Sequence, residues 1–151
     1  MLLEHGASVD AHDSKHRTAL MKASAAGHDE VCRLLLAHRA SVNIAASDGS
    51  TALMYAAVAG HALVCDLLLR NGALPDQVNS SGYSSLMLAA REGYADVCML
   101  LISGGASVHT TAPDGLTALH LSSENGHVAI CKLLLKNGAS LNVCSVRDKP
   151  Y

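Results

Sequence analysis

The 151-residue sequence contains no Phe and no Trp, and only four Tyr and three Pro. Without large aromatic side chains, its core must be filled by Leu, Ala, Val, Met and Cys, which suit thin layers that recur along a chain. Half of the residues are nevertheless hydrophobic, and that content argues against a disordered chain. The length is sufficient for one domain with a buried core.

The sequence also lacks a surplus of positive charge and a long apolar run. Its formal net charge is -2, whereas affinity for nucleic acid needs surplus Lys and Arg. No apolar run approaches the roughly 20 residues of a membrane-spanning helix, and no charged-then-apolar leader opens the sequence. The five Cys are too few and too regularly placed for a secreted disulfide framework. We therefore expect an intracellular protein, cytoplasmic or nuclear, with no nucleic-acid partner and no direct membrane insertion.

The common catalytic motifs are missing as well. The sequence has no Gly-x-Ser-x-Gly elbow, no His-Glu-x-x-His zinc motif, no phosphate-binding loop and no dinucleotide fingerprint. Its many serines stand at predicted turns and helix starts, where capping explains them. We predict that the chain is not an enzyme, has no catalytic residue and needs no cofactor.

What the sequence does contain is a set of short motifs that recurs four times at a spacing of 33 residues. Thr-Ala-Leu-Met or a close variant stands at 18–21, 51–54, 84–87 and 117–120. Gly-His or Gly-Tyr stands at 27–28, 60–61, 93–94 and 126–127, and Val-Cys or Ile-Cys at 31–32, 64–65, 97–98 and 130–131. Such regular recurrence is typical of a stack whose neighbouring units bury each other's apolar sides.

Each row predicts two short helices. A hydroxyl residue can cap the first helix by accepting a bond from a free backbone N–H, and a glycine in left-handed conformation can end it. The caps are Thr18, Thr51, Ser84 and Thr117, and the glycines are Gly27, Gly60, Gly93 and Gly126. The rows join at turn sequences, such as 47–50 and 113–116, which read as hairpin tips.

The second helix of each row has a wide apolar stripe. In the first row Val31, Leu34 and Leu35 have helical spacing, and Cys32 and Leu36 widen the stripe. A glycine then ends the helix in three rows, at Gly72, Gly105 and Gly138. Arg39 stands in that position in the first row, where a left-handed backbone would cost about 1 kcal/mol.

These rows resemble the ankyrin repeat, whose pattern reads D-x-x-G-x-T-P-L-H-x-A-A-x-x-G-H and then V-V-x-L-L-L-x-x-G-A-x-V-N. The resemblance covers nearly the whole chain and implies an all-α solenoid of antiparallel helix pairs joined by β-hairpin or loop tips. Ala19, Ala52, Ser85 and Ala118 replace the proline of the family pattern. That replacement should cost some stability without changing the fold, because proline is favoured in a first helical turn.

The resemblance also divides the chain. We expect one domain over 1–151, with a partial repeat at 1–10, full repeats at 11–43, 44–76, 77–109 and 110–142, and the start of a further repeat at 143–151. Terminal repeats normally carry a polar outer face, and neither end of this sequence does. We therefore expect a monomeric fragment of a longer array.

The family places its variable contact positions on the hairpin tips and first helices, which form a concave surface. Carried over by alignment, these partner-binding candidates are Lys15, Arg17, Lys22, Asp48, Ser50, Tyr55, Val58, Ser81, Tyr83, Leu88, Arg91, Glu92, Asp114, Leu116, Leu121 and Glu124, with Ser14, Ala25 and Ser47 beside them. They run from basic through apolar to mildly acidic. The hypothesis is an extended peptide or loop with its acidic end near Lys15 and its apolar side chains over Tyr55 and Tyr83. The alternative is that these are ordinary solvated positions and that a partner uses another face or further repeats of a longer array. Leu63 and Met99, on the opposite, convex face, are candidates for a second contact, although scattered exposed apolar residues are normal.

A metal site is not expected. Cys32, Cys65, Cys98 and Cys131 recur one per row, and neighbouring helices lie about 8 to 10 Å apart, too far for a disulfide or a shared zinc ion. We read them as small buried hydrophobes. The best metal candidate is His127 and Cys131 with His120 and Cys144, but the resemblance gives both histidines a structural role. It also makes Asn43 and Asn142 candidate hydroxylation sites, although a bond from Asn to the hairpin loop explains that residue equally well.

The leading functional prediction is a non-catalytic protein–protein interaction module of an intracellular scaffold, adaptor or regulatory protein. A second hypothesis makes the chain the target-recognition region of a larger enzyme complex, such as a ubiquitin ligase, or of a channel. A third makes it an elastic spacer without a specific partner. The sequence does not identify the partner.

Overall fold

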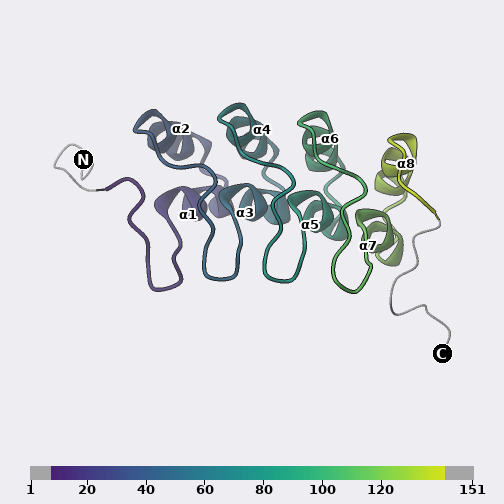
Figure 1. Cartoon of the computed structure of the whole chain (residues 1–151). Helices are drawn as coiled ribbons and strands as arrows, with labels where there is room; N and C mark the ends of the chain where they lie inside the picture. Colours follow the sequence, from purple (N-terminus) through teal and green to yellow (C-terminus); the bar gives the residue numbers. More distant parts are fainter. Residues whose placement is uncertain (1–7, 142–151) are drawn as a thin grey trace.

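The computed structural model describes residues 8–141 as a stack of helix pairs. In chain order, the helices of this part are α1 (Ala19–Ala26), α2 (Asp29–Ala37), α3 (Ala52–Ala59), α4 (Ala62–Arg70), α5 (Ser85–Glu92), α6 (Ala95–Ser103), α7 (Ala118–Glu124) and α8 (Val128–Lys136). Figure 1 shows α1, α3, α5 and α7 in one layer, called the inner layer here, and α2, α4, α6 and α8 in a second, outer layer. Long loops project beyond the inner layer, away from the outer one. The predicted all-α solenoid of helix pairs is confirmed.

Hydroxyl side chains start every inner helix, as the sequence predicted. Thr18 and Thr51 accept hydrogen bonds from the backbone N–H groups of Met21 and Met54, at 3.3 and 3.4 Å. Ser84 caps α5 and Thr117 caps α7 in the same way. These bonds satisfy one of the free N–H donors that every helix start exposes.

Left-handed residues end most of the helices. Gly27, Gly60 and Gly93 terminate α1, α3 and α5 with φ of 75°, 79° and 94°. In the fourth row Asn125 follows α7, and the predicted left-handed residue, Gly126, comes next with a φ of 72°. Arg39 has a φ of 64° after α2, the left-handed backbone that its place in the repeat predicted.

The core lies between the two layers and between successive pairs. Cys32, Cys65 and Cys98 are fully buried there, as predicted, whereas Cys131, also predicted to be buried, is only partly so. Val31 and Leu34 are a correction: they are 45% and 36% exposed. Val64, Val97 and Ile130 are buried in the equivalent position of the later rows. The helices that carry them each pack on the preceding outer helix, whereas no outer helix precedes α2 within the described residues.

Side chains also tie each unit to the next. The Nε2 of His61 donates to the carbonyl oxygen of Ala25 at 3.1 Å, and the Nε2 of His127 donates to that of Arg91 at 2.9 Å. Asn43 spans two loops: its Nδ2 donates to the carbonyl oxygen of Gly72, and its Oδ1 accepts the N–H of Leu74. These bonds fix the register of one pair on the next.

Candidate functional site

The hairpin tips form a continuous ledge beside the inner helices. The N–H of Ser47 donates to the carbonyl oxygen of Lys15 at 3.0 Å, and the N–H of Ser80 donates to that of Asp48 at 2.9 Å. The next tip has Pro113, which has no N–H; its ring packs on Gly82, where an added Cβ would lie 2.4 Å from Pro113 Cδ. We call the solvent-facing side of this ledge and of the inner helices the inner surface.

The structure places the sixteen predicted contact residues in three groups. Exposed side chains belong to Lys15, Lys22, Asp48, Ser81, Glu92 and Glu124. Half-buried side chains belong to Arg17, Tyr55, Val58, Tyr83, Arg91 and Asp114. Ser50, Leu88, Leu116 and Leu121 are a correction, since each is buried and at most 8% exposed. The three leucine side chains are removed from water by packing into the stack, so they offer little exposed area to a partner.

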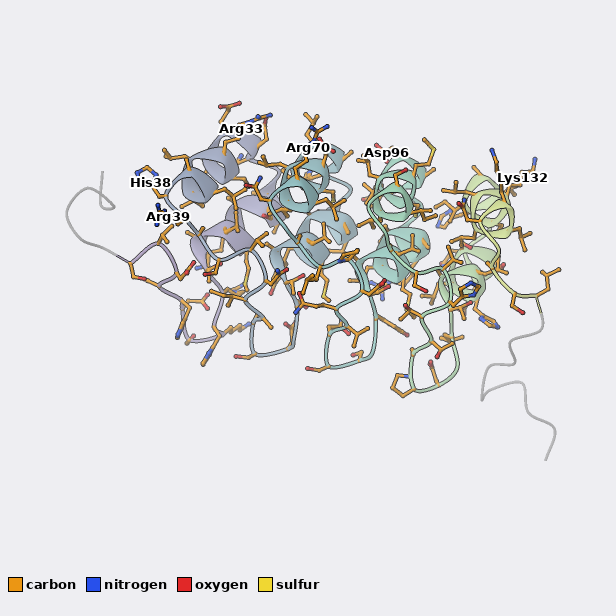
Figure 2. All side chains as sticks on the ribbon, turned by 45° about the horizontal axis from the view of Figure 1, so that its top comes forward. Arg33, His38, Arg39, Arg70, Asp96 and Lys132 are labelled. Carbon is orange, nitrogen blue, oxygen red and sulfur yellow. The ribbon has the colours of Figure 1, made fainter. Side chains whose placement is uncertain are left out.

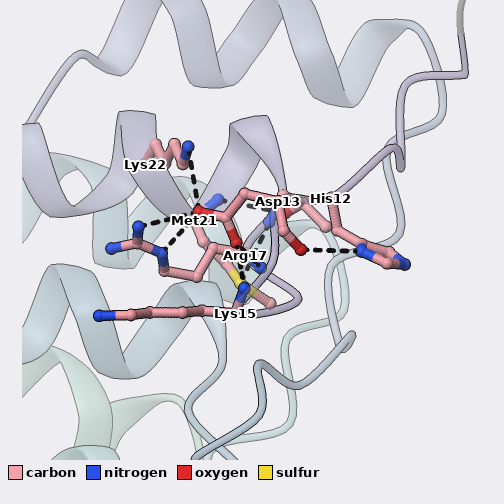
Figure 3. Close-up of polar contacts among 7 residues, drawn as sticks. His12, Asp13, Lys15, Arg17, Met21 and Lys22 are labelled. Atoms are coloured by element: carbon pink, nitrogen blue, oxygen red, sulfur yellow. Dashed lines mark hydrogen bonds and ion pairs between the residues drawn. The ribbon is translucent and has the colours of Figure 1, made fainter.

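A charged cluster surrounds Asp13 at the first hairpin (Figure 3). One oxygen of Asp13 accepts the N–H groups of Lys15 and Arg17 at 2.9 Å each. Its other oxygen receives the Arg17 guanidinium at 2.8 Å and the Lys22 ammonium at 3.2 Å. The Arg17 N–H, aided by the two cationic side chains, lowers the pKa of Asp13 far below its usual range. Sequence reasoning missed this residue, although the opposite charges of Asp13 and Arg17 four residues apart were a signal.

Two hollows meet beside this cluster. The first has a volume of about 320 Å³ and is lined by Arg17, Met21, Lys22, Ala25, Ala26 and Tyr55. The second, of about 290 Å³, is lined by Lys15, Arg17, Ala46, Ser47, Asp48 and Tyr55. Arg17 and Tyr55 belong to both, so α1, α3 and the first two hairpins bring most of the predicted basic residues to one place. Burial, followed by the charge of Asp48, raises the pKa of Tyr55, which therefore stays a neutral phenol at physiological pH.

The other predicted tyrosine has different surroundings. The guanidinium of Arg91 lies over the Tyr83 ring, 5.9 Å from its centre. The Nε of Arg91 also donates to Glu92 at 2.9 Å. Tyr83 and its charged neighbours thus contact each other, which leaves less of the ring for a partner.

The outer layer presents mixed charges, with Arg33, Arg70, Asp96 and Lys132 on its four helices (Figure 2). Leu63 and Met99 are 71% and 55% exposed there. They lie on α4 and α6. Scattered exposed apolar residues of this kind are normal on soluble proteins.

Within residues 8–141 no three His, Cys, Asp or Glu side chains are grouped so that they could hold a metal ion. His120 bonds Thr117, and Cys131 contacts the hydroxyls of Ser122 and Ser123. Burial raises the pKa of Cys65 and of Cys98 to about 12, so both remain thiols. Cys144, Asn142 and the predicted repeat start at 143–151 lie outside the described residues, as does most of the partial repeat at 1–10.

The comparisons with known proteins agree with the helix pairs. A family model described as ankyrin repeats (3 copies) matches residues 1–79 and 64–145. No curated protein matches the sequence. No helix within residues 8–141 is long and apolar enough to cross a bilayer.

Proposed function

The chain belongs to the ankyrin-repeat family, and on this premise we propose that it is a non-catalytic module that binds a protein partner on its inner surface. Ankyrin repeats are general protein–protein interaction modules. The partner is a peptide or loop of an intracellular protein, and the module serves a scaffold, adaptor or regulatory protein.

The observation that supports this proposal is that some repeat positions keep their residue type from row to row and others do not. Positions that hold the stack together keep their residue type from row to row, such as the hydroxyl caps and the left-handed glycines. Positions on the inner surface change: Lys22 is replaced by Tyr55 in the next row, and Ala25 by Val58 and then Arg91. Stacking explains the first set and leaves the second free for recognition.

The hydroxyl and imidazole side chains that a catalytic reaction would require have structural roles in this protein. The hydroxyls of Thr18, Thr51 and Ser84 cap helices, and the imidazoles of His61 and His127 bond main-chain carbonyls. The Thr117 hydroxyl contacts the His120 imidazole at 2.9 Å, but Thr117 is 4% exposed and caps α7, so this pair also has a structural role.

Proximity labelling in cells would test the proposal, followed by affinity measurement with each captured protein. We expect the Tyr55→Ala/Tyr83→Ala variant to lose a partner that the unaltered chain labels. The control is Leu63→Ala/Met99→Ala, which removes two exposed side chains from the outer layer and should retain that partner. Circular dichroism must show that both variants keep the helical content. Affinity within a factor of about two in the double-tyrosine variant would refute binding at the inner surface.

A further inference from the structure

We propose that the two hollows at Arg17 and Tyr55 bind an acidic peptide segment, in which an aliphatic residue and a neighbouring carboxylate enter together. This inference rests on the proposed function and adds the chemistry of the partner. Its evidence is the shape of the hollows, their charge and the contrast with the Tyr83 end of the same surface.

The first hollow has an apolar lining and a charged rim. Met21, Ala25 and Ala26 of α1 face the Tyr55 ring of α3 across it. Its volume of about 320 Å³ is at the low end of the range of about 300 to 1,000 Å³ for small-molecule sites. That space suits one aliphatic side chain with part of its backbone better than it suits a cofactor. The exposed methyl groups of Ala25 and Ala26 would give such a side chain dispersion contacts, as would the half-buried Tyr55 ring. Met21 is only 2% exposed and forms the floor of the hollow.

The rim carries more positive than negative charge. Lys15, Arg17 and Lys22 contribute three cations, against the carboxylates of Asp13 and Asp48. Asp13 is already bonded to Arg17, Lys22 and two backbone N–H groups, and Asp48 accepts the N–H of Ser50 at 2.9 Å.

The Lys22 side chain remains 55% exposed despite its contact with Asp13, and the Lys15 ammonium forms no ion pair with any residue in 8–141. Two lysines are therefore available to an incoming carboxylate. The neutral Tyr55 phenol is a third potential donor.

The contrast along the inner surface favours this end. At Tyr83 the nearest cation, Arg91, already covers the ring and pairs with Glu92. A ligand carboxylate there would compete with a charge pair that the protein supplies itself. At Tyr55 no such cation–ring pair is formed within residues 8–141. A basic ligand there would meet three cations against two carboxylates.

Selection from a library of random dodecapeptides displayed on phage would test the inference on the whole chain. We expect selected sequences to be enriched in Asp or Glu next to Leu, Ile, Val or Met. Synthetic peptides with the acid changed to its amide, or to phosphoserine, would then separate a requirement for carboxylate from a requirement for any anion.

Methyl NMR of protein labelled at the Met methyl carbons locates the bound peptide. The Met21 signal should shift on titration, whereas Met99, exposed on the outer helix α6, should not. Lys15→Gln/Lys22→Gln should weaken binding about fivefold to tenfold. Lys132→Gln/Lys136→Gln, which removes the same two charges from α8, should leave binding unchanged; Figure 2 labels Lys132 on that helix.

Three results would overturn the inference: selection of neutral or basic peptides, selection of none, or acidic peptides that bind equally well to the double-lysine variant. None of these results tests the proposed function. That function is tested by whether the double-tyrosine variant loses a captured partner protein. Loss of that partner together with non-acidic peptides would reject the acidic ligand and keep the binding module.

Discussion

The guanidinium of Arg91 lies 5.9 Å from the centre of the Tyr83 ring and covers its face. Tyr55, in the preceding row, instead borders two hollows of about 320 and 290 Å³. Because the Tyr83 ring already contacts a cation, less of its face is accessible to a partner. The two tyrosines are therefore not equivalent anchors.

Single substitutions should separate the two rings. We expect Tyr55→Ala to weaken binding of a captured partner or selected peptide by about tenfold, the usual effect of truncating a central aromatic residue. Tyr83→Ala should weaken it less than about threefold, because its removal mainly frees Arg91. Isothermal titration calorimetry measures both, and an equal loss in the two variants would contradict this ranking.

A backbone prediction concerns Arg39. Its left-handed φ of 64° is one that L-residues adopt at a cost of about 1 to 2 kcal/mol and glycine adopts freely. Arg39→Gly should therefore raise the free energy of unfolding by about 1 kcal/mol. Urea denaturation followed by circular dichroism provides the measurement.

The reverse change is the matched control. Gly72 occupies the equivalent place with a φ of 91°, and an added Cβ would meet no atom within 4 Å. Gly72→Ala should thus lower stability by about 1 kcal/mol through the backbone alone. If both variants shifted stability in the same direction, the left-handed conformation would not be the cause.

How far the sequence could predict this structure depends on the kind of interaction. The cap at Thr18 and the left-handed turn at Arg39 follow from local rules, and both were predicted from their places in the repeat. The exposure of Val31 and Leu88 was predicted wrongly: Val31 is exposed and Leu88 is buried. The burial of a side chain depends on which neighbouring helix covers its position, and the sequence of one row does not contain that information. The same apolar position is exposed in α2 and buried in α4, where another pair precedes it.

The candidate site shows the same limit. The basic residues Lys15, Arg17 and Lys22 were found by alignment, but their convergence with Tyr55 on shared hollows needs the stacking of α1 against α3. The role of Asp13 was missed because its donors come partly from the backbone of a hairpin. The repeat pattern nevertheless contained a signal, because Asp13 stands at its first position, D, and Asn79 accepts the equivalent N–H groups of Ser81 and Tyr83 in the third row.

The two hydrogen bonds of the Asn43 side-chain amide give a further stability prediction. Asn43 both donates to Gly72 and accepts from Leu74, at 3.0 Å in each case. Asn43→Asp keeps the acceptor but brings a carboxylate oxygen against the Gly72 carbonyl, so it should cost about 1 to 2 kcal/mol. Asn43→Ala, which removes both bonds, should cost a similar amount. Urea unfolding of the two variants measures this, and an Asp variant as stable as the unaltered chain would exclude a role for the donated bond.

Cysteine labelling should report on burial. Cys65 and Cys98 are fully buried with a pKa of about 12, whereas Cys131 is only partly covered. In a Cys144→Ser background, we expect a thiol reagent to modify Cys131 first. Cys65 and Cys98 should react only as fast as the stack opens. Mass spectrometry of timed samples gives the order, and early modification of Cys98 would contradict the described packing.

The Asp13 cluster predicts a pH dependence whose sign follows from its lowered pKa. The ordinary value is 3.8 and the folded value lies well below it, so the folded chain holds this proton less tightly than the unfolded chain. The resulting stabilisation is present above the ordinary value and is lost as pH falls through that value toward the lowered one. Asp13→Asn removes the ionisable group, so its deficit relative to the unaltered chain should be clear near about pH 7 and shrink toward about pH 3. Urea unfolding of both proteins at the two pH values measures this difference and cancels the titration of groups that they share. A deficit that stayed constant would mean that Asp13 acts through hydrogen-bond geometry alone, without its charge.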